Sequence, residues 1–174
     1  MWEEDGDLAV MYLHRDSRLI YLANPRTGST ATATALMGIG FEKVGRHHEA
    51  VKVGKGWVSF GVVRNHWDAA LSWVLAHNYP MTVESLRKAL DNEYVSENKM
   101  WGYHSPDFLL RYEHLKNELD LTLLFYDLGP VKLPRENVSH NRKGRHYREI
   151  YDSKMRDYIW DRFKDEIEEF GYEW

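Results

Sequence analysis

A short loop near residue 26 carries the side chains best suited to bind an anion. An apolar run over 19–23 breaks at an Asn-Pro pair, and a segment of helical length resumes at residue 29. The residues between and at the start of that segment are Arg26, Thr27, Gly28, Ser29 and Thr30. A helix N-terminus presents unpaired N–H groups and the positive end of the helix dipole. With one cation and three hydroxyls beside it, the loop predicts a site for a phosphate or sulfate group, most simply that of an anionic nucleotide.

The loop differs from the commonest nucleotide phosphate motif, G-x-x-x-x-G-K-[ST]. Aligned on Gly28, Ala23 stands at the first glycine and Ser29 at the lysine, so that only Thr30 fits. The cation comes first instead, at Arg26 directly after the proline. Pro-Arg-x-Gly-Ser-Thr resembles the 5′-phosphosulfate loop of sulfotransferases that use 3′-phosphoadenosine-5′-phosphosulfate (PAPS). The alternative is an ordinary strand-to-helix turn with a capping Ser or Thr.

A second segment resembles the 3′-phosphate segment of the same family. A predicted buried strand over 58–63 is followed by Arg64, and Ser72 comes eight residues after that arginine. An arginine offers a bidentate fork to phosphate oxygens and a serine offers a directional hydroxyl. His66 stands where the family usually has proline, which leaves the stiffness of this turn open. The alternative for Arg64 is a surface ion pair with Asp68.

Two later segments extend the resemblance. The sequence around Tyr112, Leu-Arg-Tyr-Glu-His-Leu-Lys, is similar to the family's Tyr-Glu-Asp-Leu-Lys element, which implies that Tyr112 lies near the adenine. Arg142, Lys143 and Gly144 resemble the Arg-Lys-Gly loop that closes on the 3′-phosphate. Two adjacent cations suit a dianion. A solvated turn before a helix is the alternative for these three residues.

The resemblance implies in-line transfer of the sulfuryl group of PAPS to a hydroxyl or amine acceptor, with 3′,5′-adenosine bisphosphate (PAP) as the product. Such a transfer needs positive charge at the leaving oxygen, a role that suits Arg26, and a base for the acceptor proton. His47 and His48 are the candidate bases, and we favour His48 because Glu49 follows it; a surface loop is the alternative for both. His-His-Glu also suggests a metal site, but no further ligand has suitable spacing, and the family's reaction uses no metal.

Composition limits the class of protein. A length of 174 residues with 43% apolar and 14% aromatic residues predicts one folded domain, 1–174, rather than a disordered chain. The formal charge of −4 argues against a broad nucleic-acid surface. The absence of cysteine removes disulfides and thiol chemistry, and no apolar run reaches the length of a membrane span. With an acidic N-terminus in addition, we expect a cytoplasmic protein.

Strands that alternate with helices predict an α/β fold, a three-layer sandwich with a mainly parallel central sheet and a P-loop-like phosphosulfate loop. The expected strands are 8–13 and 18–23, which form a hairpin, 57–63 and 108–112. The expected helices are 29–37, 67–77, 82–90 with Thr82 as N-cap, 115–128, and a long amphipathic helix over 147–170 that ends at Gly171.

The acceptor is the least determined part. Five aromatic residues could line a cleft for a sugar or an aromatic alcohol, or could be ordinary core and surface residues: Trp73, His77, Trp101, Tyr103 and His104. The chain is short for the family, so an open cleft or a homodimer that completes it are both possible. Two rival functions are a nucleotide kinase-like phosphotransferase, which the missing loop lysine disfavours, and a non-catalytic PAP/PAPS-binding module.

Overall fold

The computed structural model describes residues 10–44, 55–91, 106–134, 142 and 144–174. The chain divides into two compact units. Unit 1 comprises Met1–Val63 and Asn98–Asn137, and unit 2 comprises Arg64–Glu97 and Val138–Trp174. Each unit is described by itself below.

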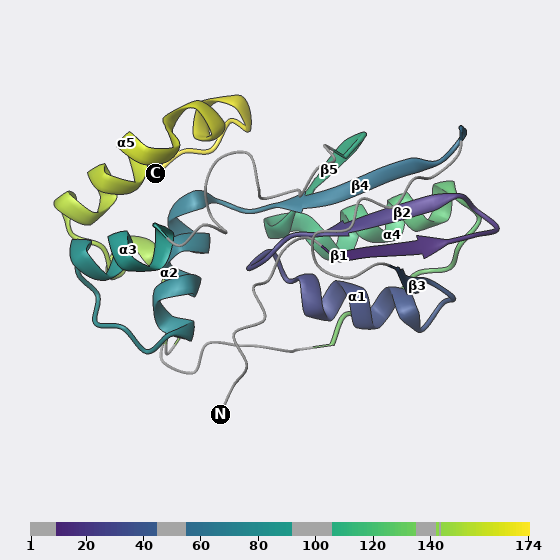
Figure 1. Ribbon diagram of the computed structural model, residues 1–174, viewed down its shortest axis with the longest axis horizontal. Coiled ribbons are helices and arrows are strands. Elements are labelled where there is room, and N and C mark those ends of the chain that lie inside the picture. The colour runs from purple at the N-terminus through teal and green to yellow at the C-terminus, as the bar shows by residue number, and fades with distance from the viewer. Residues whose placement is uncertain (1–9, 45–54, 92–105, 135–141, 143) are drawn as a thin grey trace. The chain divides into compact units, whose positions relative to one another are not determined.

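Unit 1 is built on a five-stranded mixed sheet with the strand order β3-β1-β2-β4-β5 (Figure 1). The strands are β1 (Val10–His14), β2 (Leu19–Ala23), β3 (Glu42–Val44), β4 (Val58–Val63) and β5 (Phe108–Arg111). β1 pairs antiparallel with both β2 and β3, whereas β2–β4 and β4–β5 are parallel pairs. The predicted hairpin is confirmed, since β1 and β2 pair from His14↔Leu19 outward.

The expectation of a mainly parallel sheet is met only for the three neighbouring strands β2, β4 and β5. The hairpin makes β1 antiparallel to the central strands, and β3 adds a second antiparallel pair at the edge of the sheet. β3 was not predicted because Glu42 and Lys43 are exposed and give no apolar alternation. Pairing of its backbone with Met11–Leu13 of β1 produces this strand, and such edge pairing leaves little trace in the sequence.

Two helices cover one face of this sheet. α1 (Ser29–Met37) contributes Ala33 and Leu36, and α4 (Leu115–Phe125) contributes Leu119 and Leu123, to the core that contains Tyr21, Phe60 and Val62 of the sheet. The opposite face carries a smaller apolar cluster of Met11, Leu13, Ile20 and Leu22. The described part of unit 1 therefore gives an α layer on a β layer, and a third layer is not shown within it.

The parallel pairing brings three strand ends to one edge of unit 1. Leu22 of β2 is opposite Gly61 of β4, and Val63 of β4 is opposite Arg111 of β5. The loop after β2, the chain's exit from unit 1 at Val63, and Tyr112 therefore all follow the carboxyl ends of neighbouring strands. This is the edge at which open α/β sheets bind ligands.

Unit 2 is helical (Figure 1). It contains α2 (His66–Ala76), α3 (Val83–Leu90) and α5 (Ser153–Glu169), whose apolar faces meet in one core. The predicted Thr82 cap is confirmed, because its hydroxyl accepts a hydrogen bond from the Ser85 amide at 3.1 Å. Gly171 ends the last helix as predicted, with a positive φ of 63° and the Tyr172 amide donating to the Ile167 carbonyl.

The last helix begins later than the predicted residue 147. A short 3-10 helix, η4 (Tyr147–Glu149), comes first, and the side chain of Asp152 then accepts from the Met155 amide and starts α5. The predicted apolar stripe still forms core, since Tyr147, Tyr151 and Met155 are buried across the interruption. The cap at Asp152, rather than a change in the apolar pattern, therefore sets the helix boundary.

The segment that follows α5 packs against the first residues of α2. Tyr172 makes an edge contact with His66, the Glu173 carbonyl accepts from Asn65 Nδ2 at 3.3 Å, and Trp174 makes an edge contact with Trp67. In the described parts of the chain, no helix is both long and apolar enough to cross a membrane.

Candidate functional site

The predicted anion loop leads directly into the N-terminus of α1. Gly28 is the N-cap residue and has a φ of 75°, a left-handed conformation that glycine adopts without steric cost. Because glycine has no side chain, no side-chain oxygen caps this helix, and its first turn holds no acidic residue. Neither a capping side chain nor an acidic residue of the first turn therefore offsets the positive end of this helix dipole.

Hydrogen bonds inside the loop fix its shape. The Thr27 hydroxyl donates to the Asn24 carbonyl at 2.7 Å, and the Thr32 hydroxyl donates to the Gly28 carbonyl at 3.0 Å. Thr27 is buried, so its hydroxyl closes the turn rather than facing solvent. The sequence prediction grouped Thr27 with the ligand-facing hydroxyls; in the structure its side chain supports the loop from within.

The other predicted loop residues are more accessible. Arg26 is half-buried and has a positive φ of 62°. Ser29 is half-buried at the first position of α1, and Thr30 is exposed. The cation and these two hydroxyls thus belong to residues directly before and at the start of α1; that they face a ligand stays a prediction.

Tyr112 lies beside this loop, although the two segments are far apart in sequence. A β-carbon placed on Gly28 would lie 3.0 Å from Cε2 of Tyr112 and 3.5 Å from Leu115. Tyr112 is the first residue of a 3-10 helix, η2 (Tyr112–His114), directly after β5. The structure thus brings Tyr112 to the loop, and a glycine at position 28 permits the close approach.

A buried amide lies at the base of the loop. Asn24 is fully buried, and neither its Nδ2 nor its Oδ1 has a hydrogen-bond partner among the described residues. Burial raises the pKa of Tyr21 well above its ordinary value, and the Tyr21 hydroxyl likewise has no hydrogen-bond partner among the described residues. The phenol therefore stays neutral, and the unpaired amide of Asn24 is a feature that sequence reasoning did not identify.

In unit 2, the turn that carries Arg64 is held by the N-cap residue Asn65. The Asn65 Oδ1 atom accepts from the amides of Trp67 and Asp68 at 3.1 and 3.3 Å. Its Nδ2 atom donates to the hydroxyl of Tyr147 at 3.3 Å. These hydrogen bonds fix the backbone at the start of α2, from which the side chains of Arg64 and Asp68 extend.

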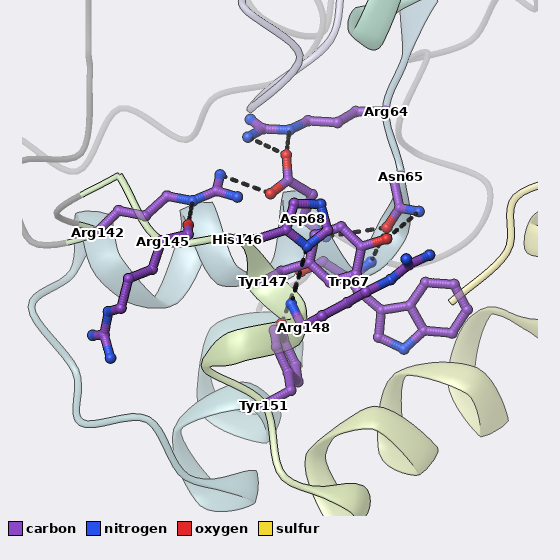
Figure 2. A network of polar contacts seen from close by, with 10 residues as sticks. All are labelled: Arg64, Asn65, Trp67, Asp68, Arg142, Arg145, His146, Tyr147, Arg148 and Tyr151. Atoms are coloured by element: carbon purple, nitrogen blue, oxygen red, sulfur yellow. Dashed lines mark hydrogen bonds and ion pairs between the residues drawn. The ribbon is translucent and has the colours of Figure 1, made fainter.

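Two predicted phosphate ligands, Arg64 and Arg142, meet at Asp68 (Figure 2). Asp68 Oδ2 contacts Nε and Nη2 of Arg64 at 2.8 and 2.6 Å, and Asp68 Oδ1 contacts Nη1 of Arg142 at 2.7 Å. Arg142 Nε also donates to the Arg145 carbonyl at 2.6 Å. The ion pair considered as the alternative for Arg64 does form, but it is buried and shared with a second arginine.

His66 occupies the first position of α2, where proline is also favoured. Its Nε2 atom lies 2.8 Å from Glu166 Oε2, and its ring stacks on Phe170 and tilts against Phe163. The side chain is thereby fixed by packing and by a hydrogen bond with Glu166 of α5. His66 thus stabilises the turn through tertiary contacts, whereas a proline would restrict the backbone through its ring.

The remaining predicted site residues are placed in part. Ser72 is half-buried on α2, four residues after Asp68 and therefore on the same side of that helix. Gly144 is exposed with a φ of 73°. Trp73 and His77 stack at 5.6 Å between ring centroids. The other predicted residues lie outside the described part of the chain: His47, His48, Glu49, Lys143, Trp101, Tyr103 and His104.

Comparisons with protein-family models, with curated proteins and with solved structures each give no match. Among the residues that the structure describes, no three His, Asp or Glu side chains are grouped as metal ligands. The function is therefore argued from the geometry of the two sites and from the motifs.

Replacement of Gly28 by alanine tests the close approach in the loop. We expect Gly28→Ala to lower the free energy of unfolding by about 1–2 kcal/mol from the left-handed backbone alone, with an added loss from the contact with Tyr112. Gly144→Ala is the matched control, since it has a similar φ and nothing within 4 Å of the new β-carbon. Urea unfolding measures both; an equal loss in the two variants would contradict the close contact.

Replacement of Asn24 by leucine tests whether its amide is unpaired. Because a buried unpaired polar group is destabilising, Asn24→Leu should raise the free energy of unfolding by about 1 kcal/mol while ligand binding at the loop falls. Asn24→Asp, of the same shape but charged, should be destabilising. A stability loss in the leucine variant would show instead that the amide has a structural partner.

Proposed function

We propose that this protein is a PAPS-dependent sulfotransferase, which transfers a sulfuryl group to a hydroxyl or amine acceptor. One observation carries the proposal. The uncapped loop, the chain's exit toward Arg64, and Tyr112 all follow the carboxyl ends of three adjacent strands of unit 1. The three motif segments that resemble the family thus leave the sheet at the edge where ligands bind. The family's three-layer fold and P-loop-like loop are part of the proposal.

In this proposal the loop binds the 5′-phosphosulfate. The uncapped N-terminus of α1 supplies N–H donors and a favourable dipole, Ser29 and Thr30 supply hydroxyls, and Arg26 supplies a cation. Thr27 closes the turn with its hydroxyl, and Gly28 shapes the loop by adopting a positive φ. Tyr112, beside Gly28, is the proposed neighbour of the nucleotide base.

The 3′-phosphate is assigned to unit 2. Arg64 and Arg142 both contact the carboxylate of Asp68, which brings two guanidinium groups close together. Guanidinium groups bind phosphate oxygens through charge-assisted hydrogen bonds, which suits a phosphate dianion. Ser72, Lys143 and Gly144 complete the set of residues proposed from the motifs.

PAPS supplies the sulfuryl group and carries PAP as its leaving group. Its S–O bond to the nucleotide breaks as the acceptor oxygen bonds to sulfur, and PAP retains the bonding electrons. Arg26 stabilises the charge that develops on the bridging oxygen. The acceptor proton passes to a base, for which the sequence offers His48 or His47. A small-molecule or carbohydrate hydroxyl is the proposed acceptor, and no metal takes part.

Nucleotide binding is the first test. We expect PAP to bind far more tightly than AMP or ATP in isothermal titration calorimetry, because only PAP presents a 3′-phosphate. Arg64→Ala should weaken PAP binding by about 2–4 kcal/mol and leave AMP binding nearly unchanged. Arg162→Ala, which removes an arginine paired with Asp91 in the same unit, is the control. Equal affinities of the wild type for AMP and PAP would refute the assignment.

Turnover separates an enzyme from a binding module. With labelled PAPS and a panel of acceptors, Arg26→Ala should lower kcat by ~10²-fold or more with a smaller change in PAP affinity, because charge at the leaving oxygen grows in the transition state. A change confined to KM would mean that Arg26 only holds the nucleotide. PAP binding without transfer to any acceptor would favour the non-catalytic alternative.

A further inference from the structure

Trp174, in the segment after α5, contacts both parts of the chain that carry the proposed 3′-phosphate ligands. Its ring makes edge contacts with the rings of Trp67 and Tyr147, each at 5.4 Å between centroids. Trp67 lies three residues after Arg64, and Tyr147 lies five residues after Arg142. One aromatic side chain therefore touches two segments that are far apart in the sequence.

The residue before it makes a second link of the same kind. Asn65 Nδ2 donates to the Tyr147 hydroxyl and to the Glu173 carbonyl, each at 3.3 Å. An amide nitrogen carries two hydrogens, so both bonds can form at once. Glu173 through its backbone and Trp174 through its ring thus hold the start of α2 against η4.

The position of Arg142 is coupled to that of η4. The Arg145 amide donates to the Arg142 carbonyl at 3.1 Å, and Arg142 Nε donates to the Arg145 carbonyl at 2.6 Å. One residue separates Arg145 from Tyr147. A shift of Tyr147 is therefore transmitted through a short, hydrogen-bonded turn to Arg142, which contacts Asp68 (Figure 2).

Further contacts surround the Trp174 ring. Tyr151 is buried and meets it edge-on at 5.8 Å, and the guanidinium group of Arg156 lies 6.0 Å from its centroid. Aromatic pairs favour such edge-to-face arrangements. A smaller side chain at position 174 would remove a contact that Trp67 and Tyr147 share.

We infer that Trp174 is a positioning residue for the 3′-phosphate: it keeps the guanidinium groups of Arg64 and Arg142 at a spacing at which both reach one anion. The inference rests on the proposed function, which assigns that phosphate to these two arginines. Donors that are already in place bind with a smaller loss of conformational entropy than donors that must be brought together. Removal of the ring should therefore weaken binding of the 3′-phosphate without removing any group that contacts it.

The direct contacts between the two segments define the alternative. Asp68 contacts both arginines, and Asn65 donates to Tyr147. If these contacts are sufficient, Trp174 contributes only to stability. Its removal then lowers the Tm and leaves the affinity for PAP unchanged.

Two substitutions at position 174 separate these roles. In calorimetric titrations well below the Tm of each variant, we expect Trp174→Ala to raise the Kd for PAP roughly 10-fold, because both arginines must then be ordered by the ligand. The Kd for AMP, which lacks the 3′-phosphate, should stay within about 2-fold of the wild-type value. Trp174→Phe keeps an aromatic ring and should restore most of the affinity for PAP.

Trp160→Ala is the matched control. Trp160 stacks on Trp67 from α5, at 6.4 Å between centroids, and its ring contact among the described residues is not with Tyr147. Its removal should change the Kd for PAP less than about 2-fold. If Trp174→Ala does not fold, Trp174→Leu is measured in its place with the same expected order. Wild-type PAP affinity in the variant at position 174, or an equal loss in Trp160→Ala, overturns the inference.

A double-mutant cycle shows whether Trp174 acts through the arginines. In the Arg64→Ala background, Trp174→Ala should weaken PAP binding less than it does in the wild type, because one of the groups that it positions is already absent. Equal losses in the two backgrounds would contradict a role in positioning Arg64.

Hydrogen exchange keeps the inference and the proposed function apart, because it needs no nucleotide. We expect Trp174→Ala to lose amide protection in residues 65–69 and 145–151 together, whereas Trp160→Ala keeps the protection of residues 145–151. If the wild type does not bind PAP, the proposed function is wrong, yet this joint loss still supports the role of Trp174 in placing the two arginines. If the wild type binds PAP and neither segment loses protection, the function stands and the positioning role does not.

Discussion

Parallel pairing of β4 with β2 and with β5 is the constraint on which the arrangement of unit 1 depends. The registers Leu22↔Gly61 and Val63↔Arg111 fix three strand ends at one edge of the sheet. Phe60 and Val62 anchor β4 in the same core as Tyr21 and Leu36. These pairings place the starts of the loop at Gly28 and of the segment at Tyr112 on the same edge, and the two lie in close contact.

The two candidate sites differ in the source of their positive charge. At the loop, the positive end of α1 is set by backbone geometry, and no capping side chain or acidic residue of the first turn offsets it. At Asp68, the positive charge comes from side chains and is partly neutralised from within. A backbone site has a fixed strength, whereas a site made of side chains can be adjusted through its counter-ion.

The sequence predicts the elements whose signals are local. The strand-turn-helix around Gly28, the cap at Thr82 and the helix end at Gly171 depend on neighbouring residues, and the structure confirms each of them. The sequence could not reveal β3, because its strand conformation comes from backbone pairing with β1 rather than from its own side chains. It also placed the start of the last helix too early, since the apolar stripe continues through the turn at Asp152.

In the candidate sites too, the sequence indicates what depends on neighbouring residues and misses what depends on tertiary contacts. The resemblance to sulfotransferase motifs singled out Arg64 and Arg142 as predicted phosphate ligands, but it could not show that Asp68 contacts both arginines, which come from segments far apart in the chain. Nor could it show that Asn24 is fully buried without a partner in the described residues. Both facts depend on tertiary packing, as does the role of Thr27 inside the turn.

The contacts of Asn65, His66 and Trp67 with the segment after α5 have a consequence for the order of folding during synthesis. The hydrogen bond from Asn65 to the Glu173 carbonyl spans 108 positions. A nascent chain emerges from the ribosome with its N-terminal residues first. The strands of the hairpin can therefore pair early, but the turn that carries Arg64 acquires its final support only after residues 172–174 have left the exit tunnel.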